Sequence, residues 1–427
     1  MKKINTIPKL DIILFLFVLF LIPPTAYSND EISEELLENP QKDEIVLNLE
    51  QGNENKQIED VETDEAAENT EIEFELFKKL DEEKPKEEIQ EDSLFGKILH
   101  SKITRTDVPS YLLQDDLTFE FKKGPFSKIQ PWIAYRGGLQ ASWLSSQYST
   151  TYENYENQIG MYGSFRNPNY KFQLTFNPIH KQGTNYLEKF IADAFIVNTS
   201  IPNHQIVLGN SRINTGIEGG KSSYVLPFVT RSQIARNYGN YRSLGAKVIG
   251  NYQYVDYNLF VGSGGRSIIS GFPGAEFNGW INFKPFGNKS QKYGKFIIGG
   301  GYNHGHNRTD YNVGSVYVSY NHKRLWTNFE AAIANGSNGS TGVTSNKSCG
   351  WAYTLGWKFT PHIQLIGRVD QFDPDRNKAH DLKREYTIGI NWFLKGQALK
   401  IVLNYVFCDN QNAKDSHKII LATQILI

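Results

Sequence analysis

The chain has 427 residues and a net charge of −1, and it is rich in aromatic residues and glycine, with 26 Phe, 23 Tyr, 7 Trp and 36 Gly. It holds only two Cys and two Met. Outside the N-terminus no apolar run approaches the ~20 residues of a membrane-spanning helix. These features exclude a helical membrane protein and favour an exported β-protein with many turns.

Residues 1–28 are predicted to be a signal peptide. Three lysines accompany a short apolar core over residues 12–22, and Ala26-Tyr27-Ser28 supplies small residues at the two positions that are recognised for cleavage. This core is too short to cross ~30 Å as a helix, so a cleaved leader is favoured over an uncleaved membrane anchor. The mature chain is expected to begin at Asn29.

Residues 29–95 are predicted to form a disordered acidic arm in the periplasm, followed by a linker over residues 96–129. Residues 30–92 carry 25 acidic and 6 basic side chains, a net charge of −19, and they hold few aromatic residues. Such a segment cannot bury enough apolar surface to fold alone. Two roles stay open for it, a solvated spacer or a segment that docks on a basic partner. The remainder of the chain is basic.

From residue 130 to residue 427 the sequence predicts consecutive β-strands. In residues 351–359 apolar and aromatic side chains occupy every second position, and Ala, Thr, Gly and Lys lie between them. Residues 385–394 and 399–407 alternate in the same way. Because successive side chains of a strand point to opposite faces, this period of two predicts strands with one apolar and one polar face.

Sixteen strands are predicted, and their connections are expected to alternate between long and short. The strand centres lie near residues 138, 161, 174, 194, 207, 246, 257, 280, 299, 316, 329, 355, 366, 389, 402 and 422. Long connections are expected at residues 147–156, 178–188, 211–240, 262–275, 304–310, 335–349, 371–384 and 408–417. Short ones are expected at residues 167–169, 202–203, 251–252, 321–323, 360–361 and 395–397, with a longer one at 285–294.

This pattern predicts an all-β fold, a transmembrane antiparallel barrel of about sixteen strands. A soluble sandwich also alternates, but here the apolar face is unusually aromatic and the opposite face is rich in Gly, Ser, Thr, Asn and Lys, as a wet lumen requires. An even strand number with short periplasmic turns and longer outer loops is typical of barrels in the bacterial outer membrane.

The polar faces of the predicted strands carry more basic than acidic side chains. The predicted pore-lining basic residues are Arg136, Arg166, Lys171, Lys247, Lys284, Lys295, Lys358, Arg368 and Lys400. The acidic residues on the same faces are Asp193, Asp256, Glu330, Asp370 and Glu385. A cationic lining lowers the cost of moving an anion out of bulk water, which favours small anions as the permeant partners. The alternative is that these groups only keep the lumen wet, or pair with the acids.

The longest expected outer connection, residues 211–240, is called the third loop below. Its apolar stretch over residues 224–229 would be costly in water, and folding into the barrel would cover it and narrow the channel. Arg212, Lys221, Arg231 and Arg236 would then join the constriction. The alternative is an exposed loop that contacts lipopolysaccharide or a neighbouring subunit.

At these residues the chain resembles the phosphate-selective porin family. The resemblance extends over residues 130–427 and is strongest at Leu226-Pro227-Phe228 with Arg231-Ser232, at residues 368–375, and in the terminal strands from Tyr386. It implies a sixteen-stranded channel that forms a homotrimer, with the third loop in the lumen and arginines and lysines guiding anions. Two features depart from the family pattern: the last residue, Ile427, is not aromatic, and the acidic arm is long.

Other residue patterns carry weaker signals. Asp373 and Asp375 lie in a loop that lacks the glycine and the distal glutamate of a calcium-binding loop, so turn capping is favoured over metal binding. Cys349 and Cys408 fall on the same outer side, and pairing stays open. No metal, cofactor or nucleic-acid partner is expected, and no residues are arranged as a catalytic nucleophile with its base. The sequence therefore predicts an outer-membrane porin surrounded by lipid and lipopolysaccharide rather than an enzyme. The alternative is a surface-exposed adhesin or antigen with an incidental lumen.

Overall fold

The structure is a computed structural model that describes residues 118–144, 147–179 and 189–426. The predicted signal peptide, the acidic arm and most of the linker lie outside the described residues. The first long strand begins at Phe126, four residues before the predicted start of the barrel. None of the helices among the described residues has the length and apolar character needed to cross a bilayer.

Seventeen strands are described, and sixteen of them, β2 to β17, are longer than two residues. They are β1 (Phe119–Glu120), β2 (Phe126–Leu144), β3 (Gln147–Phe165), β4 (Tyr170–Phe176), β5 (Ile191–Asn198), β6 (His204–Arg212), β7 (Arg242–Asn251), β8 (Val255–Ser263), β9 (Ala275–Phe283), β10 (Lys295–Asn307), β11 (Thr309–His322), β12 (Leu325–Gly339), β13 (Gly342–Thr360), β14 (Ile363–Asp373), β15 (Lys383–Lys395), β16 (Leu399–Asn410) and β17 (Ser416–Leu426). The short helices are α5 (Gly216–Gly219), η2 (Ser223–Val225), α6 (Gln233–Tyr238), η3 (Gly287–Lys289) and α7 (Ser290–Tyr293).

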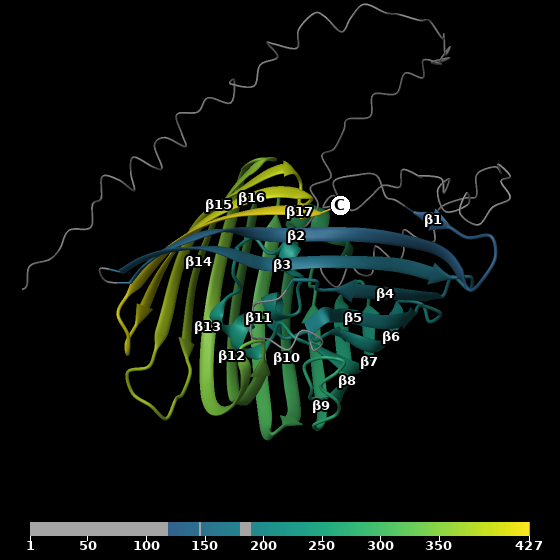
Figure 1. Ribbon diagram of the computed structural model, residues 1–427, viewed down its shortest axis with the longest axis horizontal. Coiled ribbons are helices and arrows are strands. Elements are labelled where there is room, and N and C mark those ends of the chain that lie inside the picture. The colour runs from purple at the N-terminus through teal and green to yellow at the C-terminus, as the bar shows by residue number, and fades with distance from the viewer. Residues whose placement is uncertain (1–117, 145–146, 180–188, 427) are drawn as a thin grey trace, which may run out of the picture. The chain divides into compact units, whose positions relative to one another are not determined.

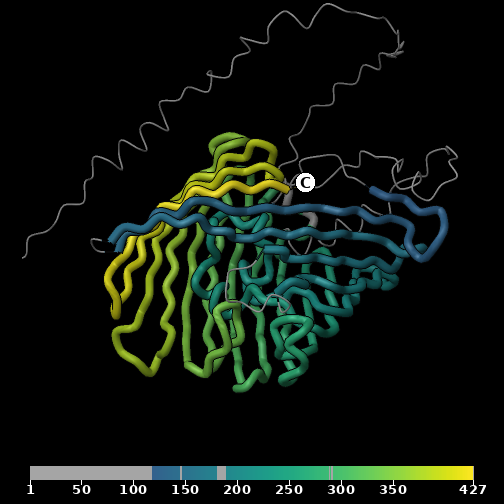
Figure 2. The backbone as a smooth tube through the Cα atoms, in the orientation of Figure 1, coloured from purple at the N-terminus to yellow at the C-terminus, as the bar shows by residue number. Residues whose placement is uncertain are grey.

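The strands close on themselves as an antiparallel barrel. Each strand from β2 to β17 pairs with its neighbours in the chain, and the ring is completed because β17 pairs with β2. Figure 1 shows this order around the wall, and in the backbone tube of Figure 2 the last strand (yellow) runs beside the first long one (blue). A closed ring leaves none of these sixteen strands with an unpaired edge, which is the condition for strands to cross a lipid bilayer.

Side chains alternate between an exposed apolar outer face and a mixed inner face. On β15, Trp392 is 50% exposed, whereas its neighbours Asn391 and Phe393 are buried. On β16, Lys400 and Asn404 are fully buried and face the interior of the ring. The inner face therefore holds most of the buried polar and charged groups, and the outer face presents large apolar side chains to the surroundings, as the alternation in the sequence predicted.

All sixteen predicted strand centres fall within strands, which confirms the predicted fold class. The prediction of long outer connections was wrong at several places. Residues 147–156 belong to β3, only Arg308 separates β10 from β11, and only residues 340–341 separate β12 from β13. These polar hairpins continue the hydrogen-bonded ladder beyond the apolar part of the wall, so they lack the apolar face by which the sequence revealed the other strands.

Candidate functional site

The third loop is the main irregular segment among the described residues, and its side chains are packed against the inner face of the barrel. It contains α5, η2 and α6 and connects β6 to β7. In its apolar stretch Tyr224, Leu226, Phe228 and Val229 are all buried. Burying such side chains stabilises the packed loop by about 1.5–3 kcal/mol for each large residue. The loop therefore fills part of the space that the strands enclose.

Arg136 of β2 holds the middle of the loop. Its guanidinium donates hydrogen bonds from Nη1 to the carbonyl oxygen of Ser223 and from Nη2 to that of Phe228, the latter at 2.8 Å. The side chain is fully buried. Both acceptors are neutral carbonyl groups. These bonds therefore fix the position of the loop without neutralising the positive charge of Arg136.

The strands at the C-terminal end of the barrel bind the same stretch. Lys400 of β16 donates to the carbonyl oxygens of Tyr224 and Leu226 at 3.3 and 3.2 Å. Gln424 of β17 donates to the Tyr224 carbonyl at 2.9 Å. The hydroxyl of Tyr224 in turn donates to Gln158 of β3 at 2.9 Å. One turn of the loop is thus fixed to three strands.

Strand β14 and a second residue of β16 continue this row of contacts. Arg368 of β14 donates from Nη1 to the Thr230 carbonyl at 2.9 Å, and its guanidinium lies 4.6 Å from the centre of the Phe228 ring. The Val229 backbone N–H donates to Asn404 of β16 at 2.8 Å. A cation over an aromatic face and a satisfied buried amide both stabilise this arrangement.

The second part of the loop is held mainly by apolar contacts. Ile234 and Tyr238 of α6 belong to a buried cluster on the inner faces of β11 to β14, which also contains Val313, Ala332, Ala334, Ala352 and Phe372. The Tyr238 hydroxyl lies 2.8 Å from the hydroxyl of Ser348. At the edge of the cluster Arg236 forms an ion pair with Glu385 at 2.8 Å.

Contacts within the loop shape its turns. Arg231 donates to the backbone carbonyls of Glu218 and Lys221, the second at 2.6 Å, and the Glu218 carboxylate accepts from the Ser232 N–H at 2.7 Å. Gly216 has a φ of +66°, a left-handed conformation, and it sits directly against the Glu330 carboxylate. A side chain there would strain the backbone and clash, so glycine lets α5 approach β12 closely.

Five basic residues of the lumen fall into two electrostatic groups. Arg242, Lys284 and Arg368 form ion pairs with Asp193, Asp256 and Asp370 at 2.7, 2.6 and 2.9 Å. Arg136 and Arg231 instead bond to carbonyl oxygens, and within the part of the chain that the structure describes neither forms an ion pair, although the Glu156 carboxylate attracts both.

The structure brings only some of the predicted site residues together around the loop. Arg136, Arg368 and Lys400 contact it from the wall, and Lys247 donates to the Arg212 carbonyl at 3.3 Å. Within the loop Arg212 donates to Asn240 at 2.7 Å and lies 3.9 Å from Glu156, while Lys221 follows α5. Lys171 is buried on β4.

The remaining predicted residues lie toward the short turns. Lys284, Lys295 and Lys358 stand at the ends of β9, β10 and β13 next to those turns. Arg166 follows β3, is exposed, and donates to the backbone carbonyls of Gly124 and Phe121 at 2.9 and 3.3 Å. Arg166 therefore stabilises a turn and does not join the residues around the third loop.

Sequence analysis missed several residues that hold the loop. Gln424 and Asn404 had a detectable signal, because each is a polar residue on the inward-facing side of its strand. The ion pair between Arg242 and Asp193 had none, since 49 residues separate its partners. The same is true of Glu276, which accepts hydrogen bonds from Tyr241, directly before β7, and from Tyr311 of β11.

The structure shows the contacts of the acidic loop and the state of the two cysteines. Asp373 accepts from the Asp375 N–H at 3.1 Å and Asp375 accepts from the Asn377 N–H at 3.2 Å, so both carboxylates cap turns. The Asn377 N–H holds the pKa of Asp375 below its ordinary value. Cys349 and Cys408 are free thiols. In the described residues no group of three or more His, Cys, Asp or Glu could hold a metal ion.

Comparisons with known proteins agree with this architecture. Residues 300–426 match the family model of the phosphate-selective porins O and P. The fold is similar to an anion-selective porin from Comamonas acidovorans, with a TM-score of 0.51 and 9% identity over 70% of this chain and 99% of that one. A loop-deletion mutant of OmpT from Vibrio cholerae is similar in fold with a TM-score of 0.52 and 11% identity, over 70% of this chain and 99% of that one. The channel DcaP of Acinetobacter baumannii is similar in fold with a TM-score of 0.51 and 11% identity, over 72% of this chain and 99% of that one. No curated protein sequence matches the chain.

A closed antiparallel barrel of sixteen strands, apolar outside and polar within, is the architecture of barrels in the bacterial outer membrane. The family match over residues 300–426 confirms the resemblance to the phosphate-selective porins that the sequence indicated. Family and fold together indicate a channel.

Proposed function

We propose that the protein is a porin for the passive diffusion of small, phosphate-like anions, with a basic lumen that the third loop narrows. The observation that carries this proposal is the pair Arg136 and Arg231. Both are buried inside the barrel at the third loop, and both donate to neutral carbonyl oxygens. Their charges would lower the energy of an anion at the narrowest part of the path.

The magnitude of this effect is sufficient for selectivity. A unit charge 4 Å from a permeating ion contributes about 1 kcal/mol at the dielectric constant of water, and more where protein walls exclude water. One such contribution changes the relative permeability of anions and cations about fivefold. Because Arg136 and Arg231 are buried and already donate to carbonyl oxygens, they act on a passing anion through their electric field and not as its direct ligands.

The comparisons support the proposed class of protein, a porin. The matching family is described as phosphate-selective, and one structure of similar fold is described as anion-selective. The identity to that structure is 9%, so the choice of solute in this chain rests on its own side chains. The proposal includes the surroundings that the sequence predicted, a homotrimer in outer-membrane lipid and lipopolysaccharide, and it makes the protein a channel without cofactor or catalytic activity.

A planar-bilayer recording of the purified full chain tests the proposal. In a potassium chloride gradient the reversal potential is expected to have the sign of an anion-selective pore, and added phosphate is expected to reduce the chloride current by competing for the positively charged region at the third loop. Cation selectivity would contradict the proposal. A closed barrel whose outer loops bind a host protein would favour the adhesin alternative instead.

A further inference from the structure

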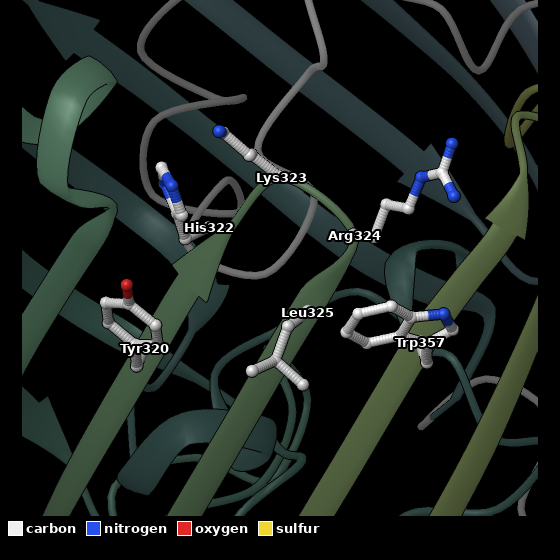
Figure 3. A pocket seen from close by; sticks show the side chains of 6 residues that line it. All are labelled: Tyr320, His322, Lys323, Arg324, Leu325 and Trp357. Atoms are coloured by element: carbon white, nitrogen blue, oxygen red, sulfur yellow. The ribbon is translucent and has the colours of Figure 1, made fainter.

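A pocket of about 520 Å³ lies on the wall where β11, β12 and β13 meet the short turns. Its lining residues are Tyr320, His322, Lys323, Arg324, Leu325 and Trp357. Figure 3 shows Leu325 between Tyr320 and Trp357, with Lys323 and Arg324 on the turn beside them. Tyr320, Leu325 and Trp357 alternate with the buried residues Ser319, Trp326 and Gly356, so they face outward.

The direction in which the pocket faces and its level along the barrel wall determine which molecules can reach it. The outer face of the barrel contacts lipid, and short turns of such barrels lie on the periplasmic side. The pocket is therefore at the level of the headgroups of the periplasmic leaflet. Lipopolysaccharide occupies the opposite leaflet, which leaves phospholipid as the molecule available at this position.

The floor of the pocket is apolar and fixed. Trp357 is 43% exposed and pairs in register with Leu325. The Tyr320 hydroxyl donates to the Tyr293 carbonyl at 3.1 Å, and the Tyr320 ring lies 6.3 Å from that of Phe296. Aromatic side chains in such a row are typical of the boundary between hydrocarbon and headgroups, where the ring contacts acyl chains and its polar edge stays wet.

The rim of the pocket is cationic. Lys323 and Arg324 form the two-residue turn between β11 and β12, both are exposed, and Lys323 has a φ of +54°. Over the described residues neither side chain takes part in a hydrogen bond or ion pair. The surrounding segments, residues 284–298, 319–326 and 355–363, contain no aspartate or glutamate. Nothing on the neighbouring strand ends therefore neutralises this pair of charges.

We propose that this pocket binds an anionic phospholipid of the periplasmic leaflet. The phosphate lies between Lys323 and Arg324, where the guanidinium group provides a bidentate contact and the lysine a point charge. The first part of an acyl chain lies on Leu325 and Trp357. The apolar floor beneath the charges distinguishes this site from one for free phosphate, which would gain nothing from it.

Native mass spectrometry of the full chain in detergent tests this proposal. Phosphatidylglycerol and phosphatidylcholine with identical acyl chains are titrated onto the protein and onto the double variant Lys323→Gln/Arg324→Gln. The protein is expected to bind phosphatidylglycerol more tightly than phosphatidylcholine. The variant is expected to bind phosphatidylglycerol about 30-fold more weakly, because two basic residues near the headgroup are lost. Phosphatidylcholine is expected to weaken less, because its choline cation offsets the charge of its phosphate.

The matched control is Lys122→Gln/Lys123→Gln, which removes the same charge from two exposed residues on the same side of the barrel. It is expected to retain full binding of phosphatidylglycerol. A photoactivatable phosphatidylglycerol is expected to label residues 320–325 and 357, and inorganic phosphate is expected not to displace it. Equal weakening in both double variants, equal affinity for both lipids, or displacement by inorganic phosphate would overturn the proposal. A heat-modifiable gel shift identical to that of the unchanged protein shows that the variants fold.

Discussion

The two parts of the third loop are held in the barrel by different forces. Residues 223–230 are bound by Arg136, Lys400, Arg368, Gln424 and Asn404, which direct hydrogen bonds at the loop backbone. Helix α6, residues 233–238, is packed by apolar side chains on β11 to β14. In the first part of the loop, charged side chains of the wall also fix the position of the loop. In the second part, the position of the loop depends mainly on apolar packing. Substitutions in the two parts therefore distinguish selectivity from constriction.

The largest effect is expected from Arg136→Ala, because it removes a charge and two hydrogen bonds to the loop together. The ratio of anion to cation permeability should fall about fivefold, and the single-channel conductance should rise as the loop loosens. Reversal potentials and single-channel recordings measure both. Arg136→Lys keeps the charge with fewer donors, so it should retain selectivity and lose part of the constriction. An unchanged permeability ratio in the alanine variant would remove Arg136 from the path of the ions.

The next effect is expected from Ile234→Ala in the apolar part of the loop, where Ile234 is fully buried. Loss of its packing should weaken the contact of α6 with the wall by about 2–5 kcal/mol. The loop contains Arg212, Lys221, Arg231 and Arg236, so its release is measured by the rate of trypsin cleavage there. Cleavage should accelerate, while the permeability ratio should stay close to that of the unchanged protein. A loss of selectivity as large as that of Arg136→Ala would show that position and not charge sets selectivity.

A third variant, Asn404→Ala, leaves the buried N–H of Val229 without its acceptor. An unsatisfied buried donor costs about 1–3 kcal/mol, so trypsin cleavage should accelerate less than in Ile234→Ala. Asn404→Asp keeps an acceptor oxygen at the same place and should restore resistance to trypsin. Equal cleavage of both variants would mean that this hydrogen bond does not hold the loop.

The smallest effect is expected from Arg236→Ala, which breaks the ion pair with Glu385 at the edge of the apolar cluster. Both partners keep some exposure to solvent, and such pairs contribute about 1 kcal/mol or less. Trypsin sensitivity at the remaining basic residues should change little, and the change should shrink further at high salt. A strong, salt-independent loss of the packed loop would place more of the binding energy in this pair than its exposure suggests.

Much of the fold could be predicted from the sequence, because the period of two in residues 351–359 and 399–407 is a direct consequence of strand geometry. The burial of residues 224–229 followed from their apolar character. The partners of the lumen cations could not be predicted, since Arg136 and Lys400 bind backbone carbonyls 87 and 174 to 176 residues away, and a carbonyl group leaves no mark in the sequence. The hairpin ends of β12 and β13 were also missed, because their polar side chains lie beyond the apolar band.

The central claim is that buried arginines at the third loop make the pore prefer anions. It is tested most directly by comparing the reversal potential of the full chain with that of the double variant Arg136→Ala/Arg231→Ala in the same potassium chloride gradient. We predict anion selectivity in the unchanged protein and a permeability ratio near one in the double variant. Cation selectivity in the unchanged protein, or full anion selectivity in the double variant, would contradict the claim.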